Sequence, residues 1–260
     1  MHRADGVAWE VYALRYGRSA AFPLADLVAE EDAEAHQAVD WYCWALRRGG
    51  SCVLVDTGFS SRRLAQRWCI EPLLDPVGLL VHLGVLPEQV SDVVLTHGHA
   101  DHTGGLGSYP RARIWLRAVE FAWIRAAMEP LRDLRWGVSL VDYETMLDAA
   151  AAGRMTLLGN HEEPLLPGVL LHPGGGHTPG SQWVQVETEG GPLVIASDNA
   201  YLFRNIEELR PIGACTSRSQ NLAALRTMRI VADQDRIVPG HDPLVAERFP
   251  QVAEGVFRLG

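Results

Sequence analysis

The sequence is poor in cysteine and contains no long apolar run. Its 260 residues include four cysteines with no close pair, so a disulfide scaffold is not expected. Cys43 and Cys52 fall in apolar, strand-like runs and are predicted to be buried free thiols. No window reaches the ~18 apolar residues of a membrane span, and no apolar stretch long enough for a signal peptide follows the N-terminus. We therefore expect a cytoplasmic protein that does not bind a membrane.

Positive charge is also scarce. Arginine and lysine together number 23 against 32 acidic residues, which leaves a net charge of −9. Binding to nucleic acid is not expected, because phosphate contacts need a basic surface. The Gly-x-Ser-x-Gly turn of serine hydrolases is absent as well, so a serine nucleophile of that kind is excluded. Any hydrolytic chemistry must come from other residues.

Histidine and aspartate are concentrated in one heptapeptide, THGHADH at residues 96–102. Three imidazoles and a carboxylate within six positions cannot all pack into an apolar core, since an unpaired buried polar group costs about 1–3 kcal/mol. A metal ion satisfies them together, because neutral imidazole and carboxylate are its usual ligands; the alternative is a solvated, histidine-rich turn. His97 and His99 project to the same side of an extended chain, whereas Asp101 and His102 tend to diverge. This arrangement favours two metal ions over one.

Three further candidate ligands lie downstream at the ends of apolar runs. His177, Asp198 and His241 each stand in a short segment of small or polar residues that closes a strand-like run. The heptapeptide itself follows the apolar run 93–95, which is predicted to be a buried strand. A lone histidine in a glycine loop is weak evidence for a ligand. Three such residues, all at strand ends downstream of the heptapeptide, are stronger evidence.

The order His-x-His-x-Asp-His, followed by a separate His, Asp and His, resembles the metallo-β-lactamase superfamily of dinuclear metal hydrolases. The resemblance spans about residues 50–242 and includes the Val-Asp-Thr-Gly motif at residues 55–58. It implies an α+β fold, a four-layer αββα sandwich with the metals at one edge between the two sheets. It also implies that Asp56 orients the ligands from behind. The implied ligands are His97, His99 and His177 for the first ion, Asp101, His102 and His241 for the second, and Asp198 as a bridge.

Two features are similar to the N-acyl homoserine lactonase and 4-pyridoxolactonase branch of that superfamily. Tyr201 stands three residues after Asp198, where a tyrosine of that branch points at the substrate carbonyl, and residues 86–93 resemble the segment before its histidines. The alternative role for Tyr201 is packing at the start of a helix. The chain departs from the branch at Gly98 and Ala100, where bulky or aromatic residues are common. The pocket beside the metals is therefore expected to be wider or to be shaped by other segments.

The resemblance implies a lactonase that opens the ester ring of an N-acyl homoserine lactone or a similar small molecule, with quorum quenching as its role. Two divalent metal ions are the implied cofactors, with zinc expected first, although iron, cobalt and manganese accept similar ligands. A metal-bound hydroxide is expected to attack the ester carbonyl. Tyr201 would donate a hydrogen bond to the carbonyl oxygen, and Asp101 would carry a proton to the leaving group.

Two other classes of protein use related metal sites. A thioesterase or glyoxalase-II-like hydrolase would act on a linear thioester. A basic cluster for a phosphate or coenzyme would favour it, and the chain offers only the scattered Arg132, Arg135 and Arg204. A flavodiiron-like redox protein would need more carboxylate ligands and a flavin domain, and His99 with His177 argues against it.

The length and the 47% hydrophobic content are sufficient for one large core, and we expect a single metallo-β-lactamase-like domain over residues 1–260. Within it, residues 115–160 have no clear match to the family and have the composition of a helical cap over the site. His172 is expected to make a contact at a strand end rather than to support the metals. The sequence leaves a homodimer open.

Overall fold

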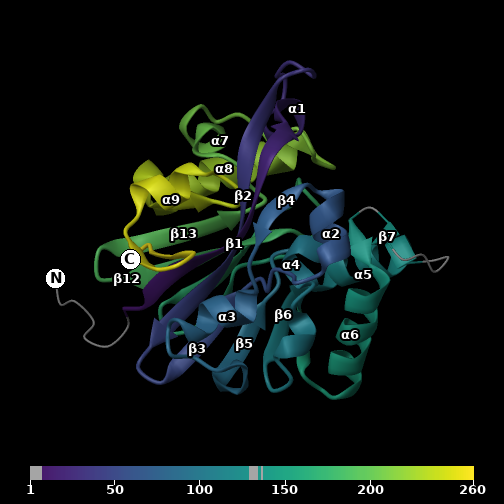
Figure 1. Ribbon diagram of the computed structural model, residues 1–260, viewed down its shortest axis with the longest axis vertical. Helices are drawn as coiled ribbons and strands as arrows, with labels where there is room; N and C mark the ends of the chain where they lie inside the picture. The colour runs from purple at the N-terminus through teal and green to yellow at the C-terminus, as the bar shows by residue number, and fades with distance from the viewer. Residues whose placement is uncertain (1–7, 129–133, 136) are drawn as a thin grey trace.

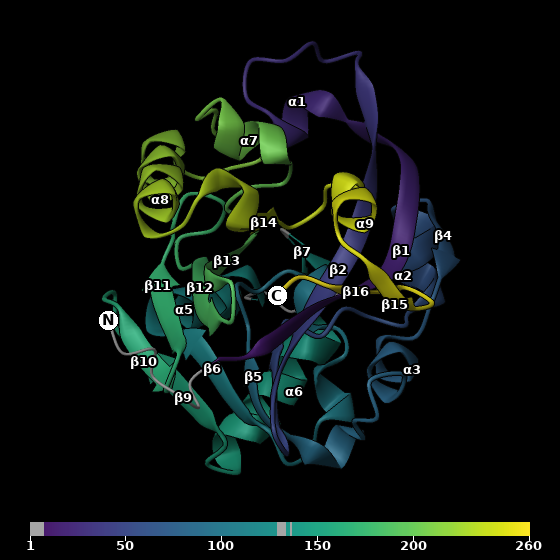
Figure 2. The same cartoon turned by 90° about the vertical axis from the view of Figure 1, so that its left-hand side faces the viewer.

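Two β-sheets face each other, and helices cover their outer sides (Figures 1 and 2). This arrangement is seen in a computed structural model of the protein, which describes residues 8–128, 134–135 and 137–260. The four layers form an α+β sandwich, so the fold expected from the sequence is confirmed.

The larger sheet has nine strands among the described residues, and the smaller has five. The strands of the larger sheet are, in spatial order, β15 (Gln251–Ala253), β16 (Val256–Arg258), β1 (Glu10–Pro23), β2 (His36–Arg48), β3 (Ser51–Val55), β5 (Val90–Val94), β6 (Arg113–Arg117) and β9 (Met155–Leu158), with β4 (Ile70–Leu73) paired to β1. Those of the smaller sheet are β10 (Glu163–Leu166), β11 (Val169–Pro173), β12 (Gln182–Thr188), β13 (Gly191–Ser197) and β14 (Ile237–Pro239). A short hairpin is formed by β7 (Leu134–Arg135) and β8 (Val138–Ser139).

The helices are mostly short. They are α1 (Leu24–Leu27), α2 (Arg62–Arg67), α3 (Pro76–Val81), α4 (Ala100–Thr103), α5 (Ala118–Met128), α6 (Leu140–Ala151), α7 (Phe203–Glu207), α8 (Arg218–Val231) and α9 (Leu244–Arg248). In Figure 1, α3, α5 and α6 cover the larger sheet, whereas α8 lies on the smaller one. In the part of the chain that the structure describes, no helix is long and apolar enough to cross a membrane.

Strand β2 shows how the larger sheet separates two apolar cores. Cys43 and Ala45 belong to a buried cluster that also contains residues of α3, α5 and α6. Trp44 and Leu46 belong to the other cluster, which includes residues of β11, β12 and β13 from the facing sheet. This alternation follows from the two-residue period of side chains along a strand. Cys43 and Cys52 are buried free thiols, as predicted, and burial raises the pKa of the Cys52 thiol to about 12.

The candidate ligands follow strands that end at one edge of the sandwich. In the larger sheet, β3 and β5 run parallel with Val55 opposite Val94, so the chain segments after both strands leave side by side. In the smaller sheet, β13 and β14 run parallel with Ser197 opposite Pro239. Gln182 joins the two sheets here, because its backbone N–H donates to the Thr96 carbonyl at 2.9 Å. Because of this strand order, segments from both sheets lie close together at one edge of the sandwich.

The described parts of residues 115–160 belong mainly to the outer layer of helices. Helix α5 packs on β6 and β9, and α6 packs on β9, so both cover the larger sheet in Figure 1. The helical cap predicted within residues 115–160 stays a prediction, and residues 129–133 and 136 of that range lie outside the described residues. The single-domain organisation of residues 1–260 likewise stays a prediction.

Candidate metal centre

The first group of candidate ligands brings three imidazoles to one point. His97 Nε2 lies 2.9 Å from His99 Nδ1, and His177 Nε2 lies 3.2 Å and 2.9 Å from these two nitrogens. Ligands at about 2.0–2.1 Å from a tetrahedral zinc ion are separated from one another by about 3.3 Å. The three nitrogens therefore have nearly the mutual spacing of ligands to one metal ion.

The second group lies next to the first and consists of Asp101, His102, His241 and again Asp198. His102 Nε2 is 2.9 Å from Asp101 Oδ2, and His241 Nε2 is 3.8 Å from the same oxygen. All four side chains are buried. Among the residues that the structure describes, His102 Nε2 has no hydrogen-bond partner of acceptable geometry although it is buried. A buried nitrogen without such a bond, close to two carboxylates, has the surroundings of a metal ligand.

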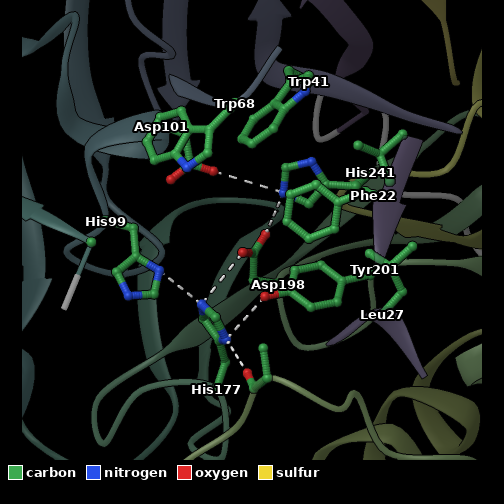
Figure 3. A pocket seen from close by; sticks show the side chains of 13 residues that line it. Phe22, Leu27, Trp41, Trp68, His99, Asp101, His177, Asp198, Tyr201 and His241 are labelled. Carbon is green, nitrogen blue, oxygen red and sulfur yellow. Dashed lines mark hydrogen bonds and ion pairs between the residues drawn. The ribbon is translucent and has the colours of Figure 1, made fainter. Parts of the chain in front are cut away.

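The Asp198 carboxylate lies between the two groups. Its Oδ2 faces His177 Nε2 at 3.4 Å and His97 Nε2 at 3.7 Å. Its Oδ1 faces His241 Nε2 at 3.1 Å and His102 Nε2 at 3.3 Å. Figure 3 shows the carboxylate between His177 and His241. One oxygen for each group is the arrangement that a bridging carboxylate requires.

Backbone carbonyls orient two of the imidazoles. His177 Nδ1 lies 2.8 Å from the Ala214 carbonyl oxygen, and His241 Nδ1 lies 2.9 Å from that of Asp40. A carbonyl oxygen only accepts, so each Nδ1 carries the proton and donates it. In the neutral imidazole, which is the form that binds a metal, the Nε2 atom of each ring then has a lone pair that faces Asp198. The neighbouring backbone thus selects the tautomer that can bind a metal.

Asp56 orients His102 and joins three strand ends. The residue directly follows β3 and has a positive φ of 60°. Its carboxylate accepts from His102 Nδ1 at 2.7 Å, from the backbone N–H and hydroxyl of Thr96 at 2.7 Å and 2.8 Å, and from the Ser197 hydroxyl at 3.2 Å. The carboxylate is fully buried. This supporting position behind the ligands is the one that the sequence resemblance implies for Asp56.

Burial and neighbouring charges divide the histidines into two sets. Burial lowers the pKa of His97 and His177, and it lowers that of His99 to about 3. These imidazoles are neutral at pH 7, as metal binding requires. For His102 and His241, burial is outweighed by the adjacent carboxylates, which raise both pKa values. Without a metal, the second group is thus held together partly by attraction between opposite charges.

A cavity of about 310 Å³ opens above both groups. Tyr201 lines it, with its hydroxyl 3.3 Å from His177 Nδ1, and burial raises the pKa of the phenol well above its usual range. The phenol is therefore a neutral donor at pH 7. The rest of the wall is largely apolar, as Figure 3 shows, and its members are Phe22, Leu27, Val39, Trp41, Trp68, Gly137 and Ala214.

These features agree with a comparison against protein-family models, in which the metallo-beta-lactamase superfamily matches residues 41–241. The chain belongs to this superfamily. The predicted family is therefore confirmed, and the match includes the heptapeptide and all three downstream ligand candidates.

Similar members of the superfamily include several lactonases. The chain is 26% identical over 221 residues to an N-acyl homoserine lactonase of a Bacillus species, covering 77% of this chain and 80% of the relative. It is 29% identical over 175 residues to an N-acyl homoserine lactonase of Azorhizobium caulinodans, covering 62% and 61%. Its fold is similar to a solved N-acyl homoserine lactone hydrolase with N-hexanoyl-L-homoserine bound at its catalytic metal centre, with a TM-score of 0.77, 20% identity and 94% and 97% coverage.

The structure brings all seven candidate ligands together, and of the two expectations for the pocket it favours the second, in which other segments shape it. Gly98 does not line the cavity. A Cβ atom there would collide with Ile124 of α5, so the space beside the glycine is filled by a helix. Ala100 is fully buried in α4. The cavity is instead shaped by other segments, chiefly β1, β2 and the residue Trp68.

His172 and Glu120 are two buried polar side chains outside the set of candidate ligands. His172, which is expected to make a strand-end contact, stacks on Trp183 at 3.8 Å, bonds Gln185 at 3.0 Å and lies 3.2 Å from the Glu162 carboxylate. None of these partners among the described residues is a candidate ligand. Glu120 was not identified from the sequence. It is fully buried beside the ligand loops, and burial raises its pKa to about 7. A single glutamate in an alanine-rich helical segment carries no sequence signal for such a position.

Proposed function

We propose that this protein hydrolyses the ester ring of an N-acyl homoserine lactone or a closely similar lactone, with two divalent metal ions. The observation that carries the proposal is the pair of adjoining ligand groups that share Asp198 beneath a cavity lined by Tyr201. Relatives named as N-acyl homoserine lactonases support the choice of substrate.

We assign His97, His99 and His177 to the first ion, Asp101, His102 and His241 to the second, and Asp198 to both. The spacing of the ligand atoms, all within 4.8 Å of one another in each group, fits this assignment. Zinc is the metal that we propose, since imidazole and carboxylate are among its preferred ligands and a relative of the same fold is described as a dizinc lactonase. Bound there, the ions would supply a water of lowered pKa and an electrophile for the ester carbonyl.

Two side chains are proposed to act on the substrate. Tyr201 would donate a hydrogen bond to the carbonyl oxygen as negative charge develops there, which its buried, neutral phenol permits. Asp101 would pass a proton to the departing alkoxide, because its carboxylate lines the cavity and lies beside the ligand His102.

The composition of the cavity favours a lactone over the thioesterase or glyoxalase-II-like alternative. Coenzyme and glutathione thioesters carry phosphate or carboxylate groups that need cationic partners. The chain contains no lysine, and no arginine lines the cavity among the described residues. Arg204 is instead paired with Glu31 at 2.7 Å, and Arg132 lies outside the described residues. An uncharged acyl group fits such a wall better than a charged carrier does.

A substrate panel tests the proposal. Lactone opening releases an acid, so N-acyl homoserine lactones and linear thioesters of similar size can be compared with a pH indicator at equal enzyme concentration. We expect kcat/KM for the lactones to exceed that for the thioesters by at least about tenfold. Higher kcat/KM for the thioesters would replace the lactonase assignment by the glyoxalase-like one. Quorum quenching, a cytoplasmic location, the absence of nucleic-acid and membrane partners and a homodimer stay predictions from the sequence.

A further inference from the structure

Helix α5 contacts both loops that carry the first ligand group. The helix begins at Ala118, directly after β6, and Glu120 stands in its first turn with no exposed surface. One loop follows β5 and contains His97 and His99. The other follows β11 in the facing sheet and contains His177.

The Glu120 carboxylate connects the backbones of these two loops. Its Oε1 accepts from the Gly98 N–H at 2.9 Å, and its Oε2 accepts from the Gly180 N–H at 2.8 Å. Gly98 lies between His97 and His99, and Gly180 lies three residues after His177. Two amides that are 82 residues apart in the chain are thus held by one side chain.

The glycines explain how the helix can approach so closely. A Cβ atom at Gly180 would lie 2.5 Å from the Glu120 backbone nitrogen, and one at Gly98 would collide with Ile124 one turn further along α5. Both contacts would be closer than those that real Cβ atoms make. The absence of a side chain at each position therefore lets the carboxylate reach both amides.

We propose that Glu120 is a positioning residue that holds the two loops in register, so that the nitrogens of His97, His99 and His177 converge on one metal ion. The inference rests on the metal site of the proposed function but not on its substrate. Among the described residues, Glu120 has no hydrogen bond to the side chain of a candidate ligand and does not line the cavity, so its effect passes through the loop backbones. It complements Asp56, which supports the second group through His102.

Substitution of Glu120 should selectively weaken the binding of one of the two ions. Glu120→Gln keeps the volume of the side chain, but its amide has a single acceptor oxygen, and its NH₂ group would face the second N–H. Supporting residues behind metal ligands typically change metal affinity about 10–100-fold. We expect Glu120→Gln to weaken the affinity for one ion by that factor and to leave the other within about threefold. Glu120→Ala, which removes both acceptors, should have the larger effect.

The experiment titrates metal-free wild-type protein and each variant with Co²⁺ and with Zn²⁺ against a chelating indicator, and follows the Co²⁺ absorption bands. Far-UV circular dichroism and thermal unfolding of the metal-free proteins report the fold. Thr188→Val is the matched control. The Thr188 hydroxyl is buried and donates to the Gly191 carbonyl at 2.7 Å. It lies at the end of β12 opposite to the site. Its loss should therefore destabilise the smaller sheet without changing a contact to a loop that carries candidate ligands.

Selective loss of one ion in Glu120→Gln, with both affinities retained in Thr188→Val, supports the inference. Two affinities within about threefold of wild type in Glu120→Gln would overturn it, as would a parallel loss of both ions that Thr188→Val reproduces. A wild-type protein that binds no ion would overturn the metal site and this inference together. A wild type that binds two ions but opens no lactone would overturn the proposed substrate alone.

Discussion

At the scale of the residue, three of the candidate ligands are held by partners whose chemistry matches the atom they contact. The carbonyls of Ala214 and Asp40 accept from His177 and His241, and a carboxylate accepts from His102. These partners determine which nitrogen carries the proton, so they determine which nitrogen is available to a metal.

A substitution of Tyr201 can separate an effect on the reaction of the substrate from an effect on metal binding. Tyr201→Phe removes one hydrogen-bond donor, which typically lowers kcat about 10–1000-fold; we expect the lower end, because a metal ion bound at the proposed site would also polarise the carbonyl oxygen. KM for an acyl lactone should change less than kcat, since the bond strengthens as charge develops. Steady-state kinetics and elemental analysis measure both effects. A variant that keeps its two ions and has wild-type kcat would remove Tyr201 from the mechanism.

The burial of Asp142 predicts that the stability of the protein depends on pH, independently of catalysis. It is 7% exposed, and burial raises its pKa from 3.8 to about 6. Its charged form is therefore disfavoured in the folded protein. The resulting loss in the free energy of unfolding is absent below pH 3.8, grows as the pH rises to about 6, and is constant above that. Asp142→Asn removes the charge and keeps an acceptor for Thr103.

The free energy of unfolding of Asp142→Asn relative to wild type should rise between pH 4.5 and pH 7.5 by roughly 1–3 kcal/mol. Urea unfolding of the metal-free proteins measures this difference. Glu144→Gln, which changes an exposed carboxylate on the same helix, is the control and should show no comparable change. A relative stability that is the same at both pH values would contradict the prediction.

At the scale of the element, the arm formed by β1, α1 and β2 makes most of the apolar wall of the cavity. It extends beyond the sheet to lie beside α7 (Figures 1 and 2). Hydrogen bonds fix it there: Ala29 N–H donates to Pro211 at 2.9 Å, and Gly213 and Ala214 donate to the Asp26 carbonyl at 3.0 Å and 2.8 Å. Since the Ala214 carbonyl accepts from His177, the wall and a ligand share one short segment.

Shortening this wall should change the preference for acyl chains. Phe22→Ala removes apolar surface from the arm, and each lost methylene contact weakens binding by up to about 0.8 kcal/mol. We expect KM for a long-chain lactone to rise several-fold more than KM for a short-chain one, with little change in kcat. Val252→Ala, an exposed apolar position on β15, is the control. Equal changes for both chain lengths would show that the acyl group binds elsewhere.

At the scale of the whole molecule, the candidate ligands come from both sheets. His97, His99, Asp101 and His102 follow β5 of the larger sheet, whereas His177, Asp198 and His241 follow strands of the smaller one. Ions bound between them would cross-link the two halves of the sandwich. Because the site exists only in the folded protein, binding adds directly to stability.

Removal of metal should therefore lower the thermal stability. At a free metal concentration about 1,000 times Kd, each bound ion adds about 4 kcal/mol, which corresponds to roughly 10 °C in Tm per ion for a protein of this size. We expect about two ions per chain by elemental analysis and a fall of this order after dialysis against a chelator, reversed by Zn²⁺. A loading that stays at one ion after reconstitution, or an unchanged Tm, would contradict the dinuclear site.

The sequence alone was sufficient to identify the candidate ligands and the fold class, because the patterns that indicate both are local. The heptapeptide places three imidazoles and a carboxylate within six positions, and small residues after apolar runs place His177, Asp198 and His241 at strand ends. These are patterns of neighbouring residues, and they can be recognised without knowing how the strands pair. The αββα sandwich came from the resemblance that those same motifs carry, and the superfamily match confirms it.

The tertiary structure alone decided what surrounds the ligands. The carbonyls of Asp40 and Ala214 carry no sequence signal, because every residue has one. Glu120 reaches amides 22 and 60 residues away, and the space beside Gly98 proved to belong to a helix rather than to the pocket. Such contacts depend on how the sheets and α5 pack against one another. Packing brings together residues that are distant in the chain, so no local pattern of residues can predict them.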